Sequence, residues 1–400
     1  MNIFTIRFQI IFIFNIVKLD YDYIICGGGI SGLLLCVKLT QNIKLSNKSV
    51  LLIDPIFPKT ENDRTLCFWD SKNTTWDEII KCKWDNVFFK SNDFNKTLDL
   101  GSLNYKMLSS SEFYNYSNSL INTNDCIEVL NADVLNFNDY KTHCTVDTLN
   151  NSFTCSKVFN SIMDWAQVKI NTKYPLLIQH FEGWVIKTDN ECFNPNKATF
   201  MDFSIKQNDL TQFMYILPFS KTEALVEYTL FSKDLLEPQK YEDAIKKYLN
   251  SSNICDYKVT SKESGKIPMT CFPFFKNNTK NILNIGSAGG WSKPSTGYTF
   301  KNIDKNTTRI ADYLKSGKSF KNFMTKDRFW FYDLIFLDVL YKENDLGKKL
   351  FTDMFKKNNS KTIFKFLDNK SNFIEEFKIM LSFPKSIFMT AVLKRLFKGL

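Results

Sequence analysis

The sequence predicts an α/β protein: a parallel-sheet domain that is interrupted by a second, β-rich unit and followed by a helical C-terminal region. Three observations support this prediction. A glycine-rich turn separates two apolar strands near the N-terminus, strand-like runs follow residue 174, and helical, basic and aromatic segments follow residue 328. With 400 residues and 44% hydrophobic composition, the chain is long enough for two domains and a substantial core.

The glycine-rich turn follows an apolar strand, Tyr23 to Cys26, and precedes an apolar helix, Leu33 to Leu39. Its spacing is GxGxxG, formed by Gly27, Gly29 and Gly32. Glycines at this spacing permit the tight turn, the approach of a pyrophosphate and close packing of the helix. A second strand, Val50 to Ile53, ends in Asp54, where an acid would bind a ribose hydroxyl. We predict a Rossmann-like dinucleotide-binding unit; a glycine turn in an ordinary βαβ unit is the alternative.

The composition argues against several other classes. The formal charge of +10 fits an anionic membrane surface or a Lys-rich exterior, and no nucleic-acid motif accompanies it. Ten cysteines without a C-x-x-C pair indicate reduced thiols in a cytoplasmic protein. With only His143 and His180, we expect no metal site.

The first 20 residues are expected to form an apolar N-terminal extension. Met1 to Val17 is interrupted by polar residues and is short for a span of about 20 residues. No small-residue cleavage site follows it. The segment either touches a membrane or has little role.

Further elements complete the first domain. Ser109 and Glu112 have capping-box spacing before a helix, Phe113 to Ile121. Val129 to Val134 and Lys157 to Asn160 are predicted strands. We expect this domain to comprise residues 21–165 and 275–320.

A substrate-binding β-sheet is predicted within residues 166–274. Its strands are Leu176 to His180, Trp184 to Lys187, Ala198 to Phe203, Phe213 to Leu217 and Ala224 to Phe231, the last two forming a hairpin. Glu227 interrupts the apolar strand ALVEYTLF, and Asp202 lies in ATFMDF. On a buried face, desolvation would raise the pKa of such a carboxyl and keep a proton ready to donate. A strand glutamate that faces solvent is the alternative.

A second glycine-rich loop follows the strand Ile282 to Ile285 and leads into a helix from about Tyr298. The candidate binding residues in it are Gly286, Gly289, Gly290, Thr296 and Gly297. Backbone amides are again presented to an anion or a carbonyl. Nicotinamide dehydrogenases do not need such a loop, whereas FAD enzymes of the glutathione-reductase and hydroxybenzoate-hydroxylase architecture do. FAD is therefore the predicted cofactor, and Arg64, in the loop after Asp54, could approach its phosphate or flavin oxygens or lie in a surface turn.

With these stretches the chain resembles the FAD-dependent lycopene cyclases, particularly their bacterial branch. The matching stretches occur in family order from Tyr21 to about residue 340: GGGISG, VLLID, NDRTLCFWD, FNPNKATFMDF, FMYILPFSKTEALVEYTLFS, GKIPMT, IGSAGGWSKPSTGYTF and RFWFYDLIFLDVL. The resemblance assigns the proton-donor role to Glu227 and places the aspartate of the family's MD motif at Asp202. The plant pattern has a second acid where this chain has Tyr228.

The resemblance implies a lycopene β-cyclase, in which acid protonates a terminal double bond, the neighbouring double bond attacks the cation, and loss of a proton leaves a β-ionone ring. Asp202 would assist or take the released proton. Reduced FAD is implied, although no electrons are consumed, and NAD(P)H is the candidate electron source. Two alternatives stay open: an FAD-dependent monooxygenase or reductase that acts on another isoprenoid, and a non-catalytic carotenoid- or membrane-binding flavoprotein.

The C-terminal region, residues 321–400, is predicted to be helical, with apolar residues at helical spacing and Lys or Arg beside them. Phe329 to Leu340 is expected to pack on the other domains, and Met380 to Leu400 is the candidate for contact with an anionic bilayer. We expect a cytoplasmic protein that associates peripherally with the inner face of the membrane.

Overall fold

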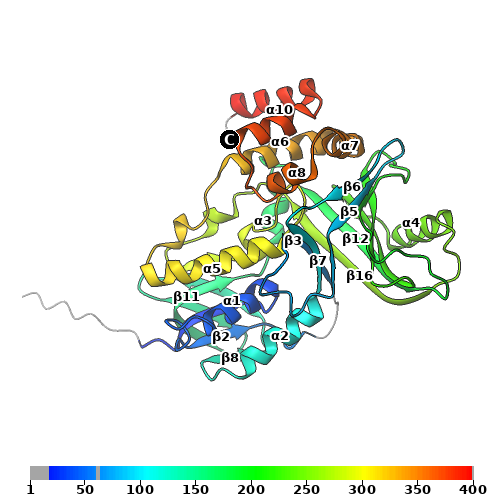
Figure 1. Cartoon of the computed structure of the whole chain (residues 1–400). Helices are drawn as coiled ribbons and strands as arrows, with labels where there is room; N and C mark the ends of the chain where they lie inside the picture. The colour runs from blue at the N-terminus through cyan, green and yellow to red at the C-terminus, as the bar shows by residue number, and fades with distance from the viewer. Residues whose placement is uncertain (1–17, 60–63, 399–400) are drawn as a thin grey trace, which may run out of the picture.

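The computed structural model describes residues 18–59 and 64–398. The expectation for Met1 to Val17 therefore lies outside the described residues, as do Asn62 and Asp63 of the loop before Arg64. The predicted α/β organisation is confirmed: two seven-stranded sheets, a three-stranded sheet and a helical C-terminal region (Figure 1).

The first sheet has the strand order β8-β2-β1-β11-β10-β9, and β17 pairs with β11. Its strands are β1 (Tyr21–Cys26), β2 (Val50–Ile53), β8 (Ile127–Leu130), β9 (Val134–Asp139), β10 (Cys144–Thr148), β11 (Ser152–Asn160) and β17 (Ile282–Asn284). The single strand predicted over Val129 to Val134 is wrong at its centre, because β8 ends and β9 begins within it. The central pairs are parallel, and every residue of β2 is buried, as expected for a covered parallel sheet.

Three helices pack together beside the first sheet: α1 (Ile30–Thr40), α2 (Ser110–Asn122) and α5 (Phe300–Ser316) (Figure 1). Their apolar residues share one core with Tyr23 and Ile25 of β1. The predicted N-cap of α2 is confirmed, because the Ser109 hydroxyl accepts a hydrogen bond from the Glu112 N–H. This packing fixes the start of α1 and the start of α5 on the same side of the sheet.

The second sheet has the strand order β16-β12-β15-β14-β13-β5-β6. Its strands are β5 (Asn86–Lys90), β6 (Asn95–Asp99), β12 (Leu177–Lys187), β13 (Ala198–Asp202), β14 (Thr211–Pro218), β15 (Glu223–Ser232) and β16 (Lys258–Met269). The predicted hairpin is confirmed as the antiparallel pair β14–β15. The sheet also contains strands from outside residues 166–274, because β13 pairs in parallel with β5 from the earlier part of the chain. Strands that pair across so long a stretch of chain share no local sequence pattern, so the sequence analysis could not predict this pair.

The two faces of the second sheet have different neighbours. Along β15, Val226 and Tyr228 pack with α4 (Pro238–Ser251), whereas Leu225 and Phe231 pack with the C-terminal helices. Side chains alternate along a strand, so residues at odd numbers of β15 face the interior of the molecule. Glu227 belongs to this interior face.

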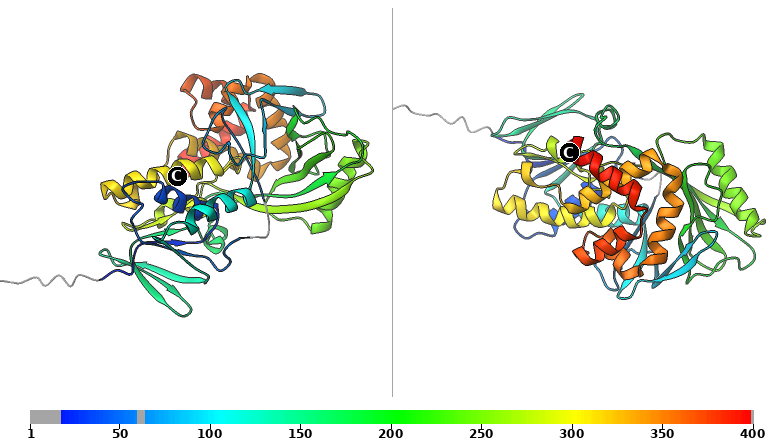
Figure 2. Two further views of the ribbon diagram at one scale, coloured as in Figure 1. Left: turned by 60° about the horizontal axis from the view of Figure 1, so that its bottom comes forward. Right: turned by 90° about the horizontal axis from the view of Figure 1, so that it is seen from above.

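The C-terminal region packs on the interior face of the second sheet and, seen from above, lies between α5 and that sheet (Figure 2). Its helices are α6 (Arg328–Lys342), α7 (Gly347–Lys357), α8 (Ser360–Leu367), α9 (Phe373–Leu381) and α10 (Lys385–Lys398). The remaining elements are the sheet β3 (Thr65–Ser71), β7 (Leu103–Ser109) and β4 (Cys82–Trp84), α3 (Trp165–Lys169), and 3-10 helices at Phe274–Asn277, Gly286–Gly289, Phe320–Asn322 and Asn344–Leu346. Within the described ranges, none of the helices has the length and apolar character needed to cross a bilayer.

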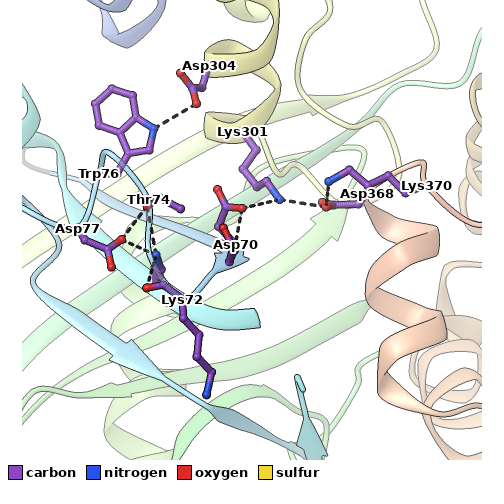
Figure 3. A network of polar contacts seen from close by, with 11 residues as sticks. Asp70, Lys72, Thr74, Trp76, Asp77, Lys301, Asp304, Asp368 and Lys370 are labelled. Atoms are coloured by element: carbon purple, nitrogen blue, oxygen red, sulfur yellow. Dashed lines mark hydrogen bonds and ion pairs between the residues drawn. The ribbon is translucent and has the colours of Figure 1, made fainter. Parts of the chain in front are cut away.

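A polar network connects the first domain to the C-terminal helices (Figure 3). Lys301, in the first turn of α5, pairs with Asp368 after α8 at 3.0 Å and with Asp70 of β3 at 3.7 Å. Lys370 also pairs with Asp368, at 3.0 Å. These contacts join three elements beside the second glycine-rich loop and hold α8 over the interior face of the second sheet.

Candidate active site

The first glycine-rich loop leaves open space at the start of α1. Gly29 is the N-cap of α1, and a Cβ added to Gly29 would meet no atom of residues 18–59 or 64–398 within 4 Å. No side chain in the described part of the chain caps this helix start, so its first backbone N–H groups face that space. Gly27 and Gly32 are packed instead: a Cβ at Gly32 would lie 2.0 Å from the Gly27 carbonyl oxygen. The loop thus has room for an anion at Gly29 and tight packing behind it.

Asp54 lies beside this loop, as predicted, and is 5% exposed. One carboxylate oxygen accepts a hydrogen bond from the Gly28 N–H at 2.6 Å, and the other accepts from the Ile56 N–H at 3.0 Å and from Lys59 at 2.9 Å. Asp54 therefore orients the glycine loop. Its contact with a ribose hydroxyl stays a prediction.

The second glycine-rich loop packs directly on the start of α1. Gly286 has a φ of +59°, and a Cβ there would lie 2.4 Å from the Ser31 Oγ. Gly289 and Gly290 belong to the same turn, and added Cβ atoms would meet Asn284 and Phe274. The structure thus brings together the two loops that the sequence analysis singled out, although they lie far apart in the chain.

Buried contacts hold the rest of this loop. Lys293 and Asp333 of α6 form an ion pair at 3.1 Å, and the Ser295 hydroxyl donates to the other Asp333 oxygen at 2.7 Å. Both charged side chains are about nine-tenths or more buried. Removing either partner of such a pair would leave an uncompensated buried charge, so the pair ties the loop firmly to α6.

Two buried polar atoms next to the loop have no hydrogen-bond partner among the described residues: the Thr296 Oγ1 and the Gln179 Oε1. Both residues line the same cavity, together with Gly297, whose added Cβ would lie 2.2 Å from Gln179 Oε1. Buried polar atoms normally find partners. These two atoms fit a ligand that offers hydrogen-bonding groups at its edge, as an isoalloxazine ring does.

A cavity of about 280 Å³ joins the glycine loops to the second sheet and the C-terminal helices. Thr296 and Gly297 line it from the second loop, Glu227 from β15, and Phe355 from α7. Arg64 also lines this cavity, so the structure brings it to the site. A compartment with polar loops on one side and apolar helices on the other can hold a cofactor and an apolar substrate together.

Glu227 is the candidate acid on the cavity wall, and its side chain is buried, with 9% of the residue exposed. Burial, and after it charge repulsion from Glu263, raise the pKa of Glu227, and a hydrogen bond from the Thr229 hydroxyl at 2.6 Å acts in the opposite direction; together they bring the pKa to about 8. At neutral pH this carboxyl therefore holds its proton.

Three tyrosines and one cysteine line the same cavity as Glu227, namely Tyr105, Tyr215, Tyr298 and Cys67. The Tyr105 and Tyr215 hydroxyls are 2.5 Å apart, and those of Tyr105 and Tyr298 are 3.1 Å apart. Burial raises the pKa of all three phenols and of the Cys67 thiol. The sequence did not indicate this cluster, because its members come from four separate elements and share no spacing.

Asp202 lies on the opposite face of the second sheet from Glu227. Its carboxylate pairs with Lys90 at 3.1 Å and accepts hydrogen bonds from the Tyr248 hydroxyl and the Ser204 N–H, both at 2.8 Å. The neighbouring Met201, not Asp202, lines the cavity. The structure does not bring Asp202 to the acid, and these contacts favour a role in holding α4 on the sheet.

Among the described residues, no three His, Cys, Asp or Glu side chains gather as a metal site. The ten cysteines are all free thiols.

The raised pKa of Glu227 predicts a pH-dependent stability. The folded protein holds this proton up to about pH 8, whereas an unfolded glutamate releases it near pH 4.5. Stability from this group is fully present below pH 4.5 and is lost as the pH rises towards 8, by on the order of a few kcal/mol. Urea unfolding of the wild type and of Glu227→Gln at several pH values checks this; the difference between them should vary over this interval, and a constant difference would contradict the assignment.

The two converging glycine loops, the open helix start and the unpartnered polar atoms fit FAD, and the fold is the Rossmann-like fold that flavin-dependent oxidoreductases and halogenases share. Solved structures with this fold are similar to the chain. A geranylgeranyl bacteriochlorophyll reductase-like protein from Thermoplasma acidophilum has 13% identity and a TM-score of 0.65, covering 92% of this chain and 98% of that one. The flavin-dependent brominase Bmp2 has 15% identity and a TM-score of 0.55, covering 95% and 100%. Halogenase PltM, in complex with phloroglucinol and FAD, has 11% identity and a TM-score of 0.55, covering 90% and 82%.

The family is narrower than the fold. The family model described as lycopene cyclase protein matches residues 22–393, and the chain therefore belongs to the lycopene cyclase family. No curated protein sequence matches it significantly.

Proposed function

We propose that this protein is a lycopene β-cyclase. The observation that carries the proposal is a buried carboxyl, Glu227, that holds its proton at neutral pH on the wall of a cavity lying between the flavin-type loops and apolar helices. Membership of the family supports a carotenoid substrate. An uncharged polyene needs an apolar site, and aromatic residues from β13 and α7, Phe200 and Phe355, supply one.

The chain's own residues account for an acid-initiated ring closure without net oxidation. The Glu227 carboxyl gives its proton to a terminal carbon–carbon double bond, and the neighbouring double bond attacks the cation to form the ring bond. The Glu227 carboxylate then takes up a ring proton, which leaves the new double bond and restores the acid, so no proton is consumed. The apolar helices α7 and α8 exclude water that would otherwise trap the cation.

Thr296, Gly297, Gln179 and Arg64 would hold the flavin at the cavity, with its pyrophosphate at Gly29. Reduced FAD would supply negative charge next to the cation. Asp54 would keep the first loop in shape through its bond to the Gly28 N–H.

Expression of the chain in a lycopene-accumulating host tests the proposal. Conversion of lycopene to γ- or β-carotene is expected, and unchanged lycopene in the presence of folded, flavin-loaded protein would overturn it. Consumption of oxygen or NAD(P)H in proportion to product would favour a monooxygenase or reductase. If NAD(P)H serves only to reduce the flavin, its use will not scale with turnover.

We also propose peripheral contact with the inner face of an anionic membrane through the α9–α10 face. This face is defined by exposed apolar residues, namely Phe373, Ile374, Phe377, Met380, Leu381, Met389, Leu393, Leu396 and Phe397. The exposed lysines Lys378, Lys385 and Lys394 lie among them. Apolar side chains interspersed with cations match an anionic lipid surface, in which the substrate would be dissolved.

Replacing Phe373 and Phe377 by serine is expected to weaken binding to phosphatidylglycerol-containing vesicles at least about tenfold, because two inserted rings are lost. Vesicle co-sedimentation measures this. Ile43→Ser is the matched control, since Ile43 is 94% exposed but belongs to the first domain. Equal losses in both variants, or none in the first, would count against this face.

A further inference from the structure

A row of residues crosses the interior face of the second sheet at Glu227. Gly183 of β12 stands directly opposite Glu227 of β15 on one side and directly opposite Glu263 of β16 on the other. Adjacent strands are about 4.8 Å apart, so the two glutamates start about 10 Å apart. Gly183 between them has no side chain of its own, and the Leu225 Cδ1 reaches over it, 2.9 Å from an added Cβ. Their side chains are long enough to approach each other over the glycine.

The Glu263 side chain leans over Gly183. A Cβ added at Gly183 would lie 3.2 Å from the Glu263 Cγ and 3.3 Å from its Oε1. Glu263 is 8% exposed, and its other oxygen, Oε2, accepts a hydrogen bond from the Thr65 N–H at 2.6 Å. A backbone N–H donated to a buried carboxylate stabilises its charged form. Glu263 is therefore anchored to β3 and directed towards Glu227.

Only one of the two acids meets the cavity. Glu227 lines the cavity, whereas Glu263, two strands away in the same row, does not. We propose that Glu263 is a positioning residue that keeps the proton on Glu227, so that the two form a carboxyl pair with one proton between them. Ionising both carboxyl groups would place two negative charges near each other in a buried site, which is unfavourable. In the proposed pair Glu263, held by the Thr65 N–H, carries the negative charge and Glu227 carries the proton. This inference rests on the proposed function in one respect: that the proton held by Glu227 is the one given to the substrate.

The other groups that face Glu227 do not compete for this role. Burial raises the pKa of the surrounding thiol and phenols, so they stay neutral where Glu227 titrates; they are Cys67, Tyr105, Tyr215 and Tyr298. Cations on the same cavity wall are Arg64 and Lys266. Charge repulsion from Glu263 adds to the burial that raises the pKa of Glu227, and the Thr229 hydroxyl acts in the opposite direction.

Glu263→Gln removes the charge but keeps an oxygen that can accept from the Thr65 N–H, so a merely structural role would survive the change. The infrared carbonyl band of protonated Glu227, identified as the band missing from Glu227→Gln, is titrated in the purified flavoprotein. We expect Glu263→Gln to lower its midpoint by at least about one pH unit, a tenfold loss of proton affinity. Glu263→Asp, which keeps the negative charge, should bring the midpoint part of the way back to its wild-type value.

An unchanged midpoint in Glu263→Gln would overturn the proposal, as would the absence of a protonated Glu227 band at neutral pH in the wild type. The high-pH limb of the cyclisation rate should move by the same amount and in the same direction. Because the infrared titration needs no carotenoid, it decides the role of Glu263 even if the protein fails to cyclise lycopene.

Discussion

Replacing Glu227 by glutamine is expected to lower the rate of lycopene cyclisation by about 10²–10⁴-fold, the range that a positioned general acid contributes. Glutamine has nearly the same volume and can still accept the hydrogen bond that Thr229 donates at 2.6 Å. It has no acidic proton to give. Carotenoid products from purified protein with reduced FAD and lycopene, separated by chromatography, measure the effect.

The matched control is Glu223→Gln. Glu223 lies at the start of the same strand, beside the turn of the β14–β15 hairpin, and is not among the cavity-lining residues. The control should cyclise lycopene at the wild-type rate, and both variants should bind FAD with unchanged affinity. Turnover retained in Glu227→Gln would mean that another group supplies the proton, and a binding function unaffected by this change would favour the non-catalytic alternative.

The glycine loops could be found from sequence because their information is local. The spacing of Gly27, Gly29 and Gly32 between a strand and a helix describes one turn, and the run from Gly286 to Gly297 describes another. Local patterns of this kind do not depend on register. The contact between the two loops is less direct, because the sequence suggests it only through the second cofactor loop. The structure shows it as the contact of Gly286 with Ser31.

The acids depend on strand pairing, which a single sequence does not contain. Glu263 faces Glu227 only because both are in register with Gly183, and a shift of one residue would turn either side chain to the other face. Asp202 shows the same dependence with the opposite outcome, since the register of β13 directs it to Lys90 and Tyr248. Sequence reasoning could propose buried acids on this sheet but not which of them share a face.

Replacing Gly29 by valine is expected to weaken FAD binding by at least about 100-fold while the protein still folds. Gly29 has a φ of −74°, which any residue adopts, and a Cβ there meets none of the described residues within 4 Å, so the side chain would be accommodated in the protein without flavin. The valine side chain would, however, occupy the space at the start of α1 where a pyrophosphate would accept hydrogen bonds from backbone N–H groups. Loss of two or more such charge-assisted hydrogen bonds corresponds to about 3 kcal/mol or more.

Flavin fluorescence titration of the apoprotein measures the affinity, and thermal unfolding of the same apoprotein measures the fold. Gly32→Ala is the contrasting variant: its Cβ would lie 2.0 Å from the Gly27 carbonyl oxygen, so the unfolding temperature should fall together with the affinity. Gly29→Val should separate the two quantities. If flavin affinity survives in Gly29→Val, the pyrophosphate lies elsewhere, and the start of α1 is not the anion site on which the placement of the flavin beside Glu227 depends.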